Sequence, residues 1–213
     1  MGYLVVMGRS TFHLPLFPLG VFLFPGEQTG LHIFEPRYRQ LVEELETAKV
    51  GGRDSDNLFG IPFHFEDVTA STGTLVKLVE VKKVHPGGRK DILIECVGHF
   101  ETHSFEAISS PKLYPAGEVI SRDIALDSEL APHHRAQVLQ IKEILSQRDI
   151  DVTELPGDTI EDLTSWLGLP PAHKHKLLAK RGQDRALFLD SVLRWTLLIL
   201  QQESKMERGF FPN

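Results

Sequence analysis

The sequence contains little cysteine, with Cys96 the only one among its 213 residues. One thiol cannot form an internal disulfide, so packing alone must hold the fold, which suits the reducing cytosol. Cys96 follows Ile92 and Ile94 in an apolar strand pattern, and we expect a buried, inert thiol rather than a nucleophile. These observations predict a cytoplasmic protein.

The sequence also lacks a long hydrophobic run. The apolar residues near the N-terminus have no basic segment before them, and Arg9 interrupts them, which argues against a signal peptide. The stretch from Trp195 to Leu200 is far shorter than the about 20 residues that a membrane-spanning helix needs. We therefore expect a soluble protein without membrane association.

Positive charge is not in excess. Basic side chains number 23 and acidic ones 29, which gives a formal net charge of -6 with neutral histidines. Because binding to phosphates requires a concentration of lysine and arginine, this balance argues against nucleic acid as the main partner.

Motifs for catalysis and cofactor binding are absent as well. The sequence has neither a phosphate-binding G-x-x-x-x-G-K-[ST] loop nor a G-x-S-x-G serine elbow. His99 and His103 fall in an expected strand, where four residues span about 13 Å, too far for one metal ion. His133 and His134 are adjacent without a supporting carboxylate pattern. We predict no catalytic residue, no metal site and no cofactor, and keep a hydrolase using Cys96 or the histidines as a remote alternative.

The pattern of apolar residues divides the chain in two. Residues 1–122 alternate apolar and polar positions between glycine and proline turns, which is typical of strands. One helix is expected in this half, beginning at Pro36 and ending at Gly51-Gly52. The four expected strands after it are 58–65, 73–84, 92–105 and 113–121, with a turn at His85–Arg89 between the second and third. We predict an α+β fold in which these strands form a small, partly closed β-barrel.

Residues 123–208 show helical spacing instead. Val138, Ile141 and Leu145 recur at helical intervals, as do Phe188, Val192, Trp195 or Thr196, and Ile199 further on. Asp158 with Glu161 resembles a capping box that opens a short helix between these two. We predict a C-terminal helical bundle over 123–208 and a short tail at 209–213.

Three motifs occur in order in the first half of the chain: Leu14-Pro15-Leu16-Phe17-Pro18-Leu19, then Phe24-Pro25-Gly26, then Leu31-His32-Ile33-Phe34-Glu35-Pro36-Arg37-Tyr38-Arg39. They resemble the N-terminal substrate-recognition domain of the Lon proteases. The resemblance is clear over residues 12–122 and looser in the later helices. It implies a PUA-like twisted β-barrel followed by a helical subdomain. His99 stands where the family usually carries arginine before the Phe.

The resemblance also implies a function, the recognition of protein substrates. We expect a stand-alone, bacterial-type member without the ATPase and peptidase, acting as a non-catalytic polypeptide-binding module. It would serve as an adaptor or scavenger for unfolded protein. The alternative is RNA binding, as in other PUA-like barrels, with Lys82, Lys83, Arg89 and Lys90 bordering the surface. No pattern predicts an oligomeric state or a particular partner.

The candidate partner-binding residues are Phe24, His32, Glu35 and Arg37. Phe24 and His32 flank an expected loop in a region rich in phenylalanine, where a small barrel would leave some rings outward as an apolar patch. Glu35 and Arg37, with Arg39, are charged residues inside an apolar stretch at a strand-to-helix junction. They are predicted either to stabilise the helix start and bond exposed carbonyls, or to line a groove for an extended peptide.

Overall fold

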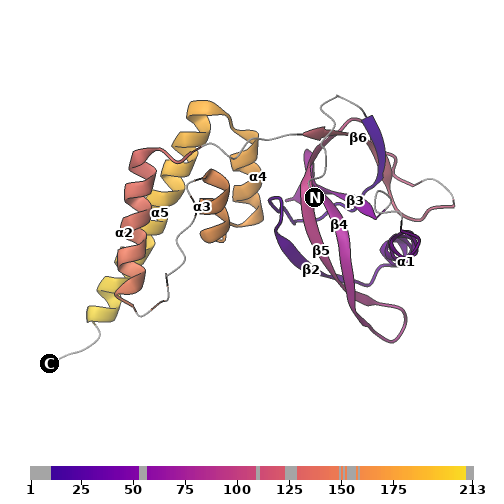
Figure 1. Cartoon of the computed structure of the whole chain (residues 1–213), viewed down its shortest axis with the longest axis horizontal. Coiled ribbons are helices and arrows are strands. Elements are labelled where there is room, and N and C mark those ends of the chain that lie inside the picture. The colour runs from indigo at the N-terminus through magenta and orange to yellow at the C-terminus, as the bar shows by residue number, and fades with distance from the viewer. Residues whose placement is uncertain are drawn as a thin grey trace. The chain divides into compact units, whose positions relative to one another are not determined.

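The computed structural model describes residues 11–52, 57–108, 111–122, 129–148, 150, 152, 157 and 159–209 (Figure 1). The chain divides into two compact units, Met1–Ile124 and Ala125–Asn213. The first unit contains the strands and one helix, and the second contains the remaining helices. Residues 210–213 of the expected tail lie outside the described part. None of the described helices is both long enough and apolar enough to cross a bilayer.

The first unit is built on a six-stranded antiparallel sheet. Its order is β1-β6-β5-β4-β3, and β2 pairs with the beginning of β5. The strands are β1 (Thr11–Pro15), β2 (Gln28–Ile33), β3 (Leu58–Phe65), β4 (Val68–Val84), β5 (Lys90–Thr102) and β6 (Ala116–Arg122). The predicted 58–65 strand is confirmed at both ends.

The longest pairing joins β4 to β5. It runs from Thr72 opposite Glu101 to Val84 opposite Lys90, with register shifts at three places. The predicted turn His85–Arg89 closes this hairpin, and the Arg89 carbonyl accepts a hydrogen bond of 2.8 Å from the His85 amide. Gly87 and Gly88 have φ of 79° and 78° there, a region that glycine adopts without steric penalty.

The turn between β3 and β4 differs from the prediction. The sequence pattern placed the start of the second strand at Gly73, whereas β4 begins at Val68. Glu66 and Asp67 make the connection with φ of 49° and 62°. Tight hairpin turns need positive φ and usually contain glycine, so a turn of two acidic residues gave no turn signal in the sequence.

Helix α1 (Pro36–Val50) confirms the predicted start and end, with Pro36 in its first turn and Gly51 following its last. The expected apolar face is buried: Tyr38, Leu41, Val42 and Leu45. These side chains join a core cluster with residues from β2, β3, β4 and β5. The helix therefore contributes one face to the core of the first unit.

The chain leaves β1 and runs beside β3, at the other end of the strand order. The Phe17 amide donates to the Gly60 carbonyl at 2.8 Å, and the Leu19 amide to the Pro62 carbonyl at 3.2 Å. The His64 amide returns a bond to the Leu19 carbonyl at 2.9 Å. This segment thus continues the main-chain hydrogen bonding past β3.

The second unit contains α2 (Pro132–Ser146), α3 (Ile160–Trp166), α4 (Pro171–Ala179) and α5 (Gly182–Gly209). Helices α2 and α5 lie in contact, and Figure 1 shows them running alongside each other. Gln137 of α2 bonds Asp190 of α5 at 3.1 Å, and Arg148 donates to the Leu200 carbonyl at 2.9 Å.

Two details of the helical prediction differ from the structure. The capping box of α3 is made by Thr159 and Asp162 rather than by the predicted Asp158 and Glu161; Asp158 lies outside the described residues. The buried stripe of α5 is Leu189, Leu193 and Leu197, whereas the predicted Trp195 and Ile199 are exposed. Both leucine and the aromatic residues recur at helical spacing on α5, so periodicity alone did not decide which stripe faces inward.

A close contact between Phe100 and two glycines fixes the strand spacing in the first unit. Phe100 on β5 is fully buried and lies opposite Gly73 on β4. A Cβ built on Gly73 would lie 2.4 Å from Phe100 Cζ and 2.5 Å from the Ile61 carbonyl oxygen, while one on Gly60 would lie 2.8 Å from the same ring. The ring therefore occupies the space that side chains at these positions would need.

Replacing Gly73 with alanine should destabilise the protein by about 1–3 kcal/mol, because the added methyl group overpacks a rigid site. Gly98→Ala is the matched control, since Gly98 also lies in a strand but a Cβ added there would have nothing within 4 Å. Urea unfolding measures both free energies. Equal stability of the two variants would show that the Phe100 contact does not constrain the sheet.

Candidate functional site

The structure buries one of the four predicted partner-binding residues. Phe24 has 0% exposure, and its ring meets the buried ring of His99 edge-on, with centroids 6.2 Å apart. The expectation that Phe24 belongs to an outward apolar patch is therefore corrected, because a fully buried ring offers no surface to a partner. Phenylalanine content showed that some rings would face outward but not which ones.

Glu35 and Arg37 pair with each other at the start of α1. Arg37 Nη2 lies 2.7 Å from Glu35 Oε2, and its guanidinium carbon lies 4.5 Å from the centre of the Tyr38 ring. Arg39, one turn into the helix, donates to the Gly87 carbonyl in the β4–β5 turn. This contact agrees with the expected bond from an arginine to an exposed carbonyl, and it ties α1 to that turn.

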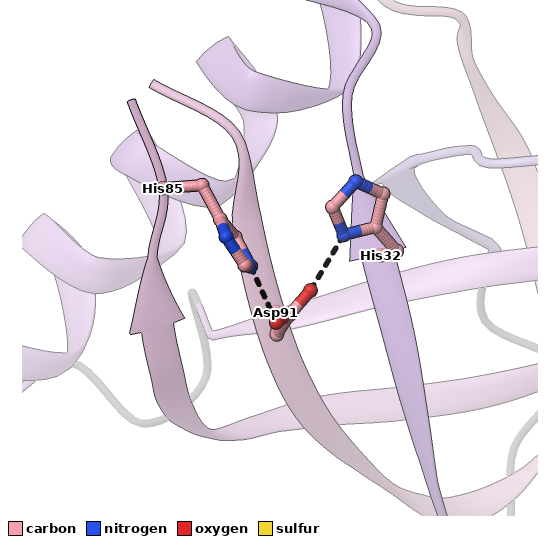
Figure 2. Close-up of side chains that lie close together, drawn as sticks. All are labelled: His32, His85 and Asp91. Atoms are coloured by element: carbon pink, nitrogen blue, oxygen red, sulfur yellow. Dashed lines mark hydrogen bonds and ion pairs between the residues drawn. The ribbon is translucent and has the colours of Figure 1, made fainter. Parts of the chain in front are cut away.

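His32, the remaining candidate, lies in a cluster with Asp91 and His85. Figure 2 shows the two imidazole rings directed at the Asp91 carboxylate from either side. His32 Nδ1 is 2.5 Å from Asp91 Oδ1, and His85 Nε2 is 2.6 Å from Asp91 Oδ2. The ring centroids of the two histidines are 5.4 Å apart. The sequence showed no signal for this group, because its members come from three separate segments.

The sheet register brings these side chains together. His32 on β2 is the direct cross-strand partner of Asp91 on β5, so both side chains lie on the same face of the sheet. His85 follows the last residue of β4 and begins the turn to β5. Its amide donates a hydrogen bond to the Arg89 carbonyl, which holds His85 in place. The ring of Phe34, two residues after His32, is exposed and stacks near His32 with centroids 6.2 Å apart.

Hydrogen bonds from the two histidines favour the ionised form of Asp91. The bond from His32, then the bond from His85, holds the pKa of Asp91 below its ordinary value, so the carboxylate stays ionised at neutral pH. Its side chain is about one third exposed. Two imidazole nitrogens and one carboxylate oxygen within 4.8 Å of one another form a set that can hold a divalent metal ion.

A second such group lies in the helical unit: His133, His134 and Asp190. The prediction that the adjacent histidines lack a carboxylate is wrong, because α5 supplies Asp190 from far along the sequence. Both oxygens of this carboxylate are already engaged, one by Gln137 at 3.1 Å and the other by Arg194 at 2.8 Å. The ring of His134 is buried, and burial lowers its pKa.

Exposed apolar side chains gather at the other end of the β4–β5 hairpin. Phe65 and Val68 form a cross-strand pair at the tip of β3 and β4 and are 50% and 67% exposed. A groove of about 410 Å³ lies beside this tip, lined by Pro62, Thr69 to Ser71 and Thr102 to Phe105. Phe105 in its wall is 49% exposed. We call Phe65, Val68 and Phe105 with this groove the apolar tip.

A different hollow, of about 540 Å³, lies along α1 and is more polar. Its wall contains Glu44, which accepts hydrogen bonds from Lys112 and, at 2.5 Å, from the Tyr114 hydroxyl. Burial raises the pKa of Glu44, but the bonds from Lys112 and Tyr114 outweigh it and leave the pKa lowered. Glu44, Lys112 and Tyr114 thus bond one another inside the hollow.

The family model of the substrate-binding domain of ATP-dependent protease La, or Lon, matches residues 13–187. The chain belongs to this family. Its fold is similar to the crystal structure of a Lon N-terminal domain protein from Xanthomonas campestris, with a TM-score of 0.58 and 24% identity over 86% of this chain and 98% of that one. The N-terminal domain of the Mycobacterium avium complex Lon protease is also similar, with a TM-score of 0.58 and 18% identity over 87% of this chain and 98% of that one. No curated protein sequence matches the chain.

The departure from the Lon family pattern at His99 has a structural counterpart. His99 is buried, with 3% exposure. Its ring stacks on Phe22 with centroids 5.3 Å apart, and Nε2 lies 2.9 Å from the Leu23 carbonyl oxygen. Burial lowers the pKa of His99, partly offset by the bond to Leu23 and the charge of Glu27.

The free energy of unfolding should therefore fall as the pH drops below about 6.5, the ordinary pKa of histidine. Below that value the unfolded chain takes up a proton that buried His99 accepts only at a lower pH, and above it this contribution is constant. His99→Gln should make the fall between pH 7 and pH 5 shallower, whereas His13→Gln, at an exposed position, should not. Unfolding curves at several pH values measure the slopes, and an unchanged slope in His99→Gln would refute this.

Proposed function

We propose that this Lon-type domain binds unfolded or partner polypeptides and holds their apolar side chains at the apolar tip. One observation carries the proposal: exposed Phe105 lines a groove, and exposed Phe65 and Val68 lie at the strand tip beside it, in a domain of the substrate-binding family. Exposed aromatic side chains beside a groove are typical of surfaces that bind other chains.

The aromatic packing supports a rigid binding surface at this place. Phe65 stacks on Phe63 with centroids 6.1 Å apart, and Phe63 meets Phe22 edge-on at 5.8 Å. Phe22 in turn stacks on His99 inside the core. The exposed ring of Phe65 is thus the outer member of a continuous aromatic series, which limits the entropy that binding would cost.

The barrel and the helical bundle expected from the family resemblance would form the scaffold of this binding surface. We propose that the sheet closes into a PUA-like barrel through the segment after β1, supported by its three main-chain hydrogen bonds to β3. We propose that the chain has a barrel domain at 1–122, and that the helices of 123–208 form a bundle around the buried leucine stripe of α5. Such a scaffold would present the apolar tip and act as a cytoplasmic adaptor or scavenger.

We propose further that the domain works by binding alone. The thiol of Cys96 is buried in β5, with its sulfur 3.4 Å from the Gly98 carbonyl oxygen, which does not suit a nucleophile. The alternative of RNA binding has less support. Lys90 is buried with its ammonium 2.5 Å from Glu46, and Lys82 lies 3.9 Å from Glu80, which reduces the positive charge of that surface.

Binding can be measured by fluorescence anisotropy with a labelled, carboxymethylated protein that stays unfolded. The double variant Phe65→Ser, Phe105→Ser should weaken binding roughly 30-fold, because each ring would lose contact area worth about 1 kcal/mol. Both rings are exposed, so the variant should keep the stability of the parent protein.

Phe34→Ser is the matched control, because Phe34 is a similarly exposed ring beside His32, away from the apolar tip. It should bind as the parent protein does. If Phe34→Ser weakens binding and the double variant does not, the surface around His32, Glu35 and Arg37 is the binding site instead. Steep loss of RNA binding with added salt, without any binding of unfolded protein, would favour the RNA alternative.

A further inference from the structure

We infer that His32, His85 and Asp91 form a binding site for a divalent transition-metal ion of the zinc type. The site lies at the closed end of the β4–β5 hairpin and is separate from the apolar tip. It has three protein ligands from three segments: β2, the turn after β4, and β5. Three protein ligands leave one position open, which water fills in zinc sites of this kind.

The geometry requires only a small adjustment. Zinc binds histidine nitrogen and carboxylate oxygen at about 2.0–2.2 Å, so tetrahedral ligand atoms lie about 3.3 Å apart. The two histidine nitrogens now lie 2.5 and 2.6 Å from the carboxylate oxygens. Each nitrogen–oxygen distance must therefore lengthen by less than about 1 Å. The two histidine ligand nitrogens, which lie within 4.8 Å of each other, must reach the same separation. Side chains that are 48%, 37% and 23% exposed, for His32, Asp91 and His85, leave room for this rotation.

The strands supply the preorganisation that a metal site needs. His32 and Asp91 are fixed opposite each other by the β2–β5 register, and the turn holding His85 is bonded to α1 through Arg39. On binding, each ring nitrogen that faces Asp91 would offer its lone pair to the ion. The ring proton would then sit on the other nitrogen of the same imidazole, so no net proton release is needed from neutral histidines.

The surroundings determine which ion fits. Lys83 lies opposite Asp91 on β4, and Arg89 is nearby in the sequence, so a purely electrostatic attraction for cations is weak here. Calcium and magnesium prefer several oxygen ligands, of which the site offers one carboxylate. Imidazole nitrogens suit zinc and similar ions, and the site should discriminate in their favour.

The helical group of His133, His134 and Asp190 fits a metal less well. Its carboxylate already binds the Arg194 guanidinium and the Gln137 amide, so an ion would have to displace a positive charge from it. The Asp91 carboxylate, in contrast, contacts His32 and His85, which would themselves bind the ion. This difference makes the helical histidines a natural control.

The test is calorimetric titration of the full chain with Zn²⁺ at pH 7.5, with Co²⁺ absorption as a probe of coordination. We expect one equivalent at the site, unaffected by millimolar Ca²⁺ or Mg²⁺. His32→Gln, His85→Gln and Asp91→Asn should each weaken zinc binding more than about tenfold. Even the loss of a hydrogen-bond partner of a metal ligand lowers metal affinity about 10- to 100-fold, and these variants remove a ligand itself. His133→Gln should leave it unchanged.

Circular dichroism checks that each variant is folded. If a variant is unfolded, NMR spectroscopy of the parent protein takes the place of that variant. Substoichiometric Zn²⁺ should then shift the ring resonances of His32 and His85 before those of the other histidines. Zinc binding that survives Asp91→Asn and His85→Gln, or that is lost only in His133→Gln, or that does not occur at all, would overturn the inference. Asp91→Asn should bind unfolded protein as well as the parent protein does. The zinc measurements and the polypeptide measurements can therefore refute the metal site and the proposed function separately.

Discussion

The ladder between β4 and β5 is the constraint on which the rest of the first unit depends. It connects two surfaces of different chemistry, the histidine–aspartate cluster at its closed end and the apolar tip at its open end. Along an extended strand, the distance from Asp91 to Thr102 is at most about 36 Å. Because β2, β3 and β6 pair with this hairpin and α1 contacts β4, the register of the hairpin decides which side chains meet at either end.

Close packing at Phe100 sets how the neighbouring strands approach one another. Its ring lies over Gly60 and Gly73, and Leu14, Leu16 and Val119 complete the small cluster around it. Leu16 belongs to the segment that runs on from β1 to lie beside β3. The same contact therefore holds the first and last strands of the sheet order near each other, and with them the base of the β3–β4 tip.

Much of the fold could be predicted from local sequence. Pro36 and Gly51 marked the ends of α1, and the His85–Arg89 turn was recognisable from its glycines, because these residues act through their own backbone. The turn at Glu66 and Asp67 could not be predicted, since its residues adopt positive φ without the usual signal. The family motifs predicted the Lon substrate-binding domain, which the match over residues 13–187 confirms.

The sites were less predictable, because they depend on tertiary contacts. His32 was selected because it flanks an expected loop, but its partners Asp91 and His85 follow only from the tertiary structure. Phe24 and Phe65 occur in similar apolar stretches, yet the first is buried and the second is exposed at a turn that the sequence did not reveal. Partner binding by Glu35 and Arg37 stays a prediction, while their mutual ion pair gives them a structural role at the helix start.

Occupation of the apolar tip by polypeptide substrates can be observed by chemical-shift mapping of the isotope-labelled protein during titration with an unfolded polypeptide. We expect shifts concentrated at residues 65–71 and 102–105, with little change around His32 and Asp91. Shifts confined to the α1 hollow or to the helical unit, or no shifts at saturating polypeptide, would contradict binding at the tip.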